Sequence, residues 1–120
     1  MKNLLIETTE AITRSNHDTE DITFIGSLVS GHSCAWDQFR QLADREYNAG
    51  FGGQEVARDL VIVFSDDTLL VREEYDGAEA WRFVQFIAPP DTRHPIKSVF
   101  ATDSFEGYWS TLEELNSTIP

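Results

Sequence analysis

The chain has 120 residues, of which 41% are hydrophobic and 12% aromatic, and its formal net charge at pH 7 is −12. That length and apolar content fit one folded domain, 1–120, and exclude an intrinsically disordered chain. The charge argues against direct binding to nucleic acid or to an anionic membrane, because each approach to phosphate is repulsive, and it favours a basic protein partner. Solubility alone is the alternative explanation for the acidic balance.

Cysteine content and hydropathy indicate where the protein works. The single cysteine, Cys34, excludes an intrachain disulfide, which suits a reducing compartment. No stretch has the length of a membrane span, and residues 1–12 lack the apolar core and cleavage site of a signal peptide. We therefore expect a soluble, cytoplasmic protein.

The first third of the chain predicts one strand and one helix. Residues 2–15 fit either a short amphipathic helix or a strand, because β-branched residues interrupt the helical pattern. Residues 22–29 alternate apolar and small side chains, which is typical of a strand. Residues 33–47 predict the clearest helix, with Ser33 as its N-cap. Its apolar stripe consists of Trp36, Phe39, Leu42 and Ala43.

Residues 59–87 predict three strands joined by two tight turns, and the rest of the chain is expected to cover or extend them. Residues 60–64 are continuously apolar and rich in β-branched side chains, which suits a strand buried on both faces. After the turn at 65–67, residues 68–75 form the second strand. Asp76-Gly77 is a strong hairpin signal, because glycine accepts the positive φ of such a turn. The third strand is expected to end at residue 87.

The last third predicts one more strand and a second helix. Prolines at 89 and 90 prevent an interior strand from continuing, because proline lacks the amide donor. Residues 96–101 resemble an edge strand, and residues 105–115 form an amphipathic helical pattern. The predicted fold is therefore α+β, an antiparallel sheet of four to five strands with two amphipathic helices packed against it.

Several patterns that suggest chemistry are weak in this sequence. The glycine-rich stretch 50–53 lacks the residues that follow in phosphate-binding loops, so a structural turn is the better interpretation. The three histidines, His17, His32 and His94, lack the ligand spacing of zinc sites. Cys34 near His32 resembles a nucleophile with its base, but a small residue in a helical first turn explains it more simply. We predict no catalytic residues, no metal and no cofactor.

The acidic residues of the central strands are the most informative feature. A hydrolase dyad or metal site could assemble across the strands from Asp66, Glu73 and Glu79, although no spacing demands it. The hairpin 72–81 crowds carboxylates and two aromatic residues around one turn, with Arg72 as its only base. Such crowding costs stability and suggests a binding role; a solvated turn with its aromatic residues in the core is the alternative. The predicted partner-binding residues are Asp66, Asp67, Glu73, Glu74, Tyr75, Asp76, Glu79 and Trp81.

Residues 36–83 resemble small acidic proteins of phages, plasmids and integrated elements. The resemblance rests on three segments of those proteins, W-x-x-F-x-x-L-A-x-x-E-Y, G-F/Y-G-x-x-E-V-A-x-D-L-V-V-V and E-Y-D-G-x-E-x-W-x-F. The matching residues here are Trp36, Phe39, Leu42, Ala43, Glu46, Tyr47, residues 50–57, 59–63 and 74–77, Glu79, Trp81 and Phe83. The resemblance covers about two fifths of the chain. It implies a mobile-element origin, in which such proteins often block a host machine, as anti-CRISPR proteins do.

Together these observations predict a non-enzymatic inhibitor that docks an acidic surface, as a mimic of DNA would, on a basic nucleic-acid-handling host protein such as a CRISPR effector. An immunity protein against a basic toxin nuclease fits the same features. A carboxylate- or metal-dependent hydrolase is the enzymatic alternative.

Overall fold

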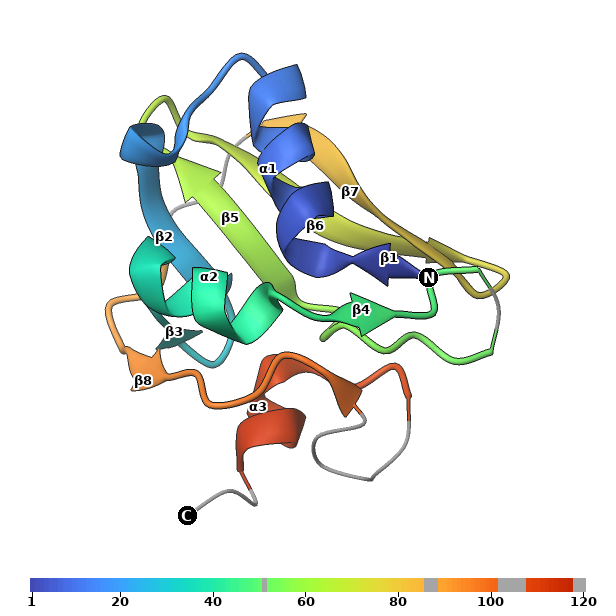
Figure 1. Ribbon diagram of the computed structural model, residues 1–120. Coiled ribbons are helices and arrows are strands. Elements are labelled where there is room, and N and C mark those ends of the chain that lie inside the picture. The colour runs from blue at the N-terminus through green and yellow to red at the C-terminus, as the bar shows by residue number, and fades with distance from the viewer. Residues whose placement is uncertain (51, 86–88, 102–107, 118–120) are drawn as a thin grey trace.

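A six-stranded sheet with two helices on one face forms the centre of the molecule (Figure 1). The computed structural model describes residues 1–50, 52–85, 89–101 and 108–117. The sheet order is β7-β6-β5-β2-β3-β8, and β1 and β4 form a separate two-stranded sheet. The strands are β1 (Lys2–Asn3), β2 (Ile22–Ser27), β3 (His32–Ser33), β4 (Glu46–Tyr47), β5 (Leu60–Phe64), β6 (Thr68–Tyr75), β7 (Ala78–Gln85) and β8 (His94–Pro95). The helices are α1 (Leu4–Arg14), the 3-10 turn η1 (Thr19–Asp21), α2 (Trp36–Ala43) and α3 (Leu112–Asn116).

The α+β class is confirmed, but the predicted sheet is wrong in detail. Neighbouring strands from β7 to β3 are antiparallel, whereas β3 and β8 pair in parallel, so the sheet is mixed. The parallel pair joins His32 to His94, which are far apart in the sequence. No strand is present at 96–101; instead Phe100 makes a single bridge to Val56. Pairings between distant short segments have no local sequence signal, which explains the error.

The central hairpins follow the predicted pattern closely. All five residues of β5 are buried, and they alternate between two apolar clusters on opposite faces of the sheet. Asp76 (φ 55°) and Gly77 (φ 89°) form the two-residue turn between β6 and β7, as the Asp-Gly pair predicted. The third strand begins at Ala78, directly after the turn, and its predicted last residues, 86–87, lie outside the described residues.

The helices differ from their predicted bounds. The N-terminal segment forms α1, with the Asn3 side chain accepting a hydrogen bond from the Ile6 N–H. Helix α2 is shorter than the predicted 33–47, because Ser33 pairs with Gly26 in the sheet and Tyr47 pairs with Lys2. The N-cap of α2 is therefore Ala35, which makes no side-chain capping bond.

The C-terminal helix begins later than residue 105. Thr111 and Glu114 form a capping box at the start of α3, which fixes that end of the helix. Tyr108 and Trp109 precede the helix and are both exposed, while residues 105–107 lie outside the described residues.

The larger apolar cluster lies between the sheet and helices α1 and α2. Leu4 and Ile12 of α1 and Phe39 of α2 are almost fully enclosed there. Each such side chain stabilises the fold by about 1.5–3 kcal/mol. On the opposite face a smaller cluster includes Phe24, whose ring lies 4.9 Å from the Arg93 guanidinium carbon. Burial on both faces holds the central strands, and with them the turns at their two ends, in fixed positions.

Candidate functional site

The predicted binding hairpin contains two residues that belong to the core. Glu79 is 2% exposed and Trp81 is 7% exposed. The Trp81 indole N–H donates to the Thr8 hydroxyl at 2.9 Å, which attaches β7 to α1. The prediction that Glu79 and Trp81 bind a partner is therefore corrected, since both side chains are enclosed in the core. For Trp81, the alternative interpretation of an aromatic residue in the core holds.

A buried ion-pair cluster accounts for Glu79. Arg72 donates to Glu79 at 3.2 Å through Nη2 and to Glu7 at 3.2 Å through Nη1. Arg72 Nη2 also donates to the Tyr47 hydroxyl at 2.9 Å, and that hydroxyl donates to Glu7. The guanidinium lies 4.8 Å from the centre of the Trp81 ring. The cluster thus joins α1, β4, β6 and β7 around one cation.

The carboxylate of Glu79 also binds the backbone. Its oxygens accept the Glu55 N–H at 2.6 Å and the Val56 N–H at 3.2 Å. Burial raises the pKa of Glu79, while these hydrogen bonds and Arg72 act in the opposite direction. Within the guanidinium, Arg72 Nε is enclosed without a hydrogen-bond partner among the described residues. The sequence indicates this cluster only through spacing. Arg72 is two residues from Leu70 on the same strand, so both side chains point to the face that carries the larger apolar cluster.

Two of the remaining hairpin carboxylates, those of Glu73 and Glu74, make contacts within the hairpin. The Glu74 carboxylate accepts the Gly77 N–H at 2.6 Å and so closes the turn. Glu73 lies 3.3 Å from Arg82 across the strand pair, and both side chains are about half exposed. Asp76 and Tyr75 are exposed at the tip, with Tyr75 at 78%. The hairpin therefore offers fewer free negative charges than its sequence suggests.

Asp66 and Asp67 lie at the opposite end of β6 from this tip. Eight residues of extended strand separate the two turns, a length of about 26 Å at ~3.3 Å per residue. The predicted binding residues thus form two separate groups and not one continuous ridge. The three carboxylates considered for a hydrolase, Asp66, Glu73 and Glu79, are likewise not brought together. Glu79 lies opposite Glu74, so Glu73 and Glu79 are on opposite faces of the sheet, and Glu79 is enclosed.

A second acidic segment packs beside Asp66 and Asp67. The Ser65 N–H donates to the Asp21 carbonyl at 2.8 Å, which attaches η1 to the β5–β6 turn. His17 Nε2 lies 2.8 Å from Asp66 Oδ2, and the His17 ring stacks on Phe64 at 3.9 Å. Carboxylates from two distant segments therefore share one end of the sheet. We define the acidic end as Asp18, Glu20, Asp21, Asp66 and Asp67.

Local hydrogen bonds fix the backbone of the acidic end. Asp18 and Asp21 form a capping box around η1. Asp66 accepts the Thr68 hydroxyl at 2.6 Å, and this bond, followed by the contact with His17, lowers the pKa of Asp66 to about 2. Glu20 and Asp67 are exposed. Asp18, Glu20 and Asp21 were not among the predicted binding residues, and only their acidic, turn-prone composition could have indicated them.

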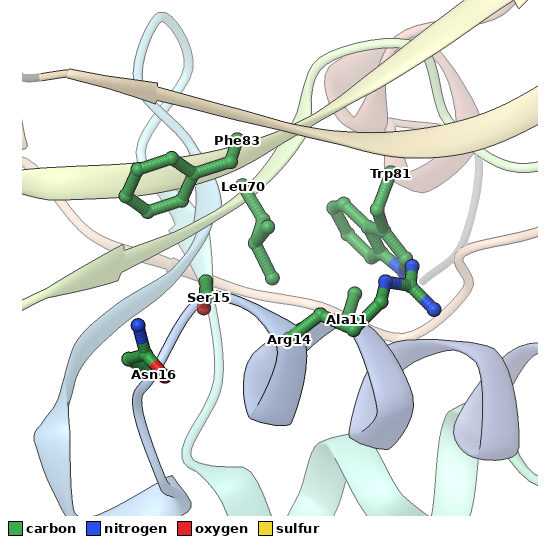
Figure 2. A pocket seen from close by; sticks show the side chains of 7 residues that line it. All are labelled: Ala11, Arg14, Ser15, Asn16, Leu70, Trp81 and Phe83. Atoms are coloured by element: carbon green, nitrogen blue, oxygen red, sulfur yellow. The ribbon is translucent and has the colours of Figure 1, made fainter.

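Two cavities lie between α1 and β7. Figure 2 shows Trp81 of β7 directed toward the helix, with Arg14 below it, and the Phe83 ring above Ser15 and Asn16. The first cavity has a volume of about 270 Å³ and is lined by Ala11, Arg14, Ser15, Asn16, Leu70, Trp81 and Phe83. The second, of about 280 Å³, shares Arg14 and Trp81 and extends toward Lys2. Each is slightly smaller than the ~300 Å³ of the smallest typical ligand sites.

The weaker sequence candidates have structural explanations. Burial raises the pKa of Cys34 to about 12, which disfavours a nucleophilic thiolate. His32 and His94 lie with ring centres 5.0 Å apart, but no group of three or more metal-binding side chains forms within the described residues. A Cβ added at Gly53 would lie 1.9 Å from the Tyr108 ring, so close packing explains this glycine. No helix in the described part of the chain is long and apolar enough to cross a bilayer.

Comparison with protein families, with curated proteins and with solved structures finds no match for this chain. Its function is therefore argued from its own residues.

Proposed function

We propose that this chain is a non-enzymatic acidic inhibitor, encoded by a phage or mobile element, that binds a basic nucleic-acid-handling host protein. An anti-CRISPR protein acting on a CRISPR effector is the specific form of the proposal. The partner would use lysine and arginine side chains that otherwise hold nucleic acid, and the bound inhibitor would occupy their place as a mimic of DNA. The observation that carries the proposal is the net charge of −12 together with the acidic end.

The acidic end supports this function because its charges are exposed on a fixed backbone. Glu20 and Asp67 lie on turns held by the sheet and by the bond between Ser65 and Asp21. Charged groups already held in place lose little conformational entropy on binding. The exposed hairpin tip, Tyr75 and Asp76, supplies a second and smaller contact in the proposal.

The proposed mechanism is steric and electrostatic competition. Complementary charges accelerate encounter and specify the partner, so association should weaken as salt rises. An immunity protein that neutralises a basic toxin nuclease would use the same surface, and the choice between them depends on which partner is bound.

The test is inhibition of DNA cleavage by a purified CRISPR effector assembled with its guide RNA. We expect the chain to bind the effector and slow cleavage at about 50 mM salt, and to bind more weakly at about 500 mM. The double variant Glu20→Lys, Asp67→Asn removes charge from the acidic end and should abolish inhibition, because asparagine keeps the positive φ of Asp67.

The matched control changes the net charge by the same amount elsewhere. Glu46→Lys with Asp91→Asn alters two exposed positions outside the acidic end and should leave inhibition intact. Equal loss in both variants would show that total charge, and not this surface, drives binding. Absence of binding to the effector at low salt would remove the anti-CRISPR form of the proposal.

A further inference from the structure

Strand β7 ends the sheet, and part of its outer edge is unpaired. Because Tyr75 and Ala78 close the two-residue hairpin, the even-numbered residues of β7 bond to β6. The odd-numbered residues therefore turn their N–H and C=O groups outward. The first of these, the Glu79 N–H, donates to the Ala49 carbonyl at 3.0 Å. Among the described residues, no backbone partner occupies the outward groups of Trp81, Phe83 or Gln85.

This free edge has one of the features that usually protect an edge strand, the exposed charge of Arg82, and lacks the others. Residues 81–85, Trp-Arg-Phe-Val-Gln, contain no proline, lysine or inward-pointing charge. Phe83 is 45% exposed and lines the same cavity as Arg14 (Figure 2). An unpaired backbone edge next to an exposed aromatic ring is a template for a further strand.

Local charge indicates which strand fits. Lys2, Arg14 and Arg82 lie along this edge and the adjoining cavities, where they offset the carboxylates of Glu10 and Glu73. A basic segment, the kind of partner that the overall charge favours, would meet these three cations. A second copy of the chain instead meets a surface of balanced charge. The edge is thus suited to pairing with a second copy, whereas the acidic surface of the rest of the molecule repels a second copy.

We propose that β7 pairs antiparallel with β7 of a second copy, around a two-fold axis at Phe83. The free stretch runs from Trp81 to Gln85, and Phe83 is its midpoint, so this register uses every free group. Trp81 then lies opposite Gln85 of the second copy. Arg82 lies opposite Val84, whereas a shift of the axis to residue 82 would place two arginines face to face, which is unfavourable.

The first test is the mass of the protein in solution by sedimentation equilibrium, from about 1 µM to about 1 mM. We expect a monomer that becomes a dimer as concentration rises, and a tighter dimer at higher salt, because salt screens the repulsion between two acidic chains. Phe83→Glu places two carboxylates opposite each other and should abolish the dimer. Val29→Glu adds the same charge at an 85% exposed position outside β7 and should retain it.

The second test is cross-linking, which reports the register and does not depend on the affinity. In a Cys34→Ser background, Phe83→Cys places two thiols across a hydrogen-bonded pair with Cα atoms about 5.5 Å apart, within disulfide range. Arg82→Cys places its Cα atoms about 8 Å apart, outside that range. We expect oxidation to cross-link the first variant and not the second.

Three outcomes would overturn the proposal. They are a monomer at all concentrations, a dimer that survives Phe83→Glu, and cross-linking that is equal at both cysteine positions. None of these results bears on the acidic end, which contains no residue of β7. The failure of this inference is therefore distinguishable from failure of the proposed function.

Discussion

Arg72 lies 3.2 Å from Glu79 across the β6–β7 hairpin, and both side chains are fully enclosed. This pair converts a hairpin that looks like an anionic surface into an element tied to the core. Taking two charges out of water is costly, and the cost is offset only when every partner is present. The cluster therefore makes the hairpin sensitive to the loss of any one charge within it.

Arg72→Met is expected to destabilise the protein by about 3–5 kcal/mol, because it leaves Glu7 and Glu79 buried without their cation. Arg82→Met removes the other arginine of the same hairpin, but its pair with Glu73 is exposed to solvent and contributes about 0–1 kcal/mol. Urea unfolding followed by circular dichroism measures both values. An equal loss in the free energy of unfolding for the two substitutions would contradict the conclusion that Arg72 holds the buried cluster together.

Local signals in the sequence predicted the central strands well. A continuous, β-branched apolar run placed β5, and the turn signals at 65–67 and Asp76-Gly77 placed the two ends of β6, since these features depend only on neighbouring residues. The ends of α2 were wrong because Ser33 and Tyr47 pair with Gly26 and Lys2, and no local pattern reveals such pairings.

The candidate site was predictable only in part, for a similar reason. Glu79 looked like a surface charge because its burial depends on Arg72 and on the backbone of residues 55–56. Asp66 and Asp67 were identified, but η1 is joined to their turn by the Ser65 N–H and the Asp21 carbonyl, a contact that spans more than forty residues of sequence. Side-chain type alone therefore indicated acidic binding, while tertiary contacts decide which acids remain exposed.

Cys34 is expected to react slowly with thiol reagents in the folded protein. Burial raises its pKa to about 12 from the ordinary 9.0. At pH 8 such a thiol carries about a thousandfold less thiolate, and the thiolate is the reactive form. Reaction with Ellman's reagent should be correspondingly slow in buffer and rapid in urea. Rapid reaction of the folded protein, with no change in its circular dichroism spectrum, would contradict a buried, inert thiol.

Gly53→Ala is expected to destabilise the protein because its new methyl group would collide with the Tyr108 ring, 1.9 Å away. The same substitution in a Tyr108→Ala background should cost less, because the colliding ring is absent. A double-mutant cycle by urea unfolding measures the difference, expected at about 0.5–3 kcal/mol for side chains in contact. An identical cost in both backgrounds would place the strain elsewhere in the 52–53 turn.

Asp66 is expected to contribute a stabilisation that disappears in acid. Its pKa in the folded state is lowered from 3.8 to about 2, first by the Thr68 hydroxyl and then by His17. Between these values the unfolded chain binds more protons than the folded one, so stability falls as pH decreases. The contribution is present above the unfolded pKa and is lost as the pH falls through about 2.

Asp66→Asn isolates this effect, because it removes the titrating group and keeps the shape of the side chain. The wild-type protein should have a higher urea midpoint than the variant at about pH 5, and the two midpoints should converge toward about pH 2. Asp91→Asn, which removes an exposed carboxylate outside the acidic end, provides the control for charge alone. If the difference between the two urea midpoints persists unchanged at about pH 2, Asp66 stabilises the turn by its shape and not by its ionised contacts with Thr68 and His17.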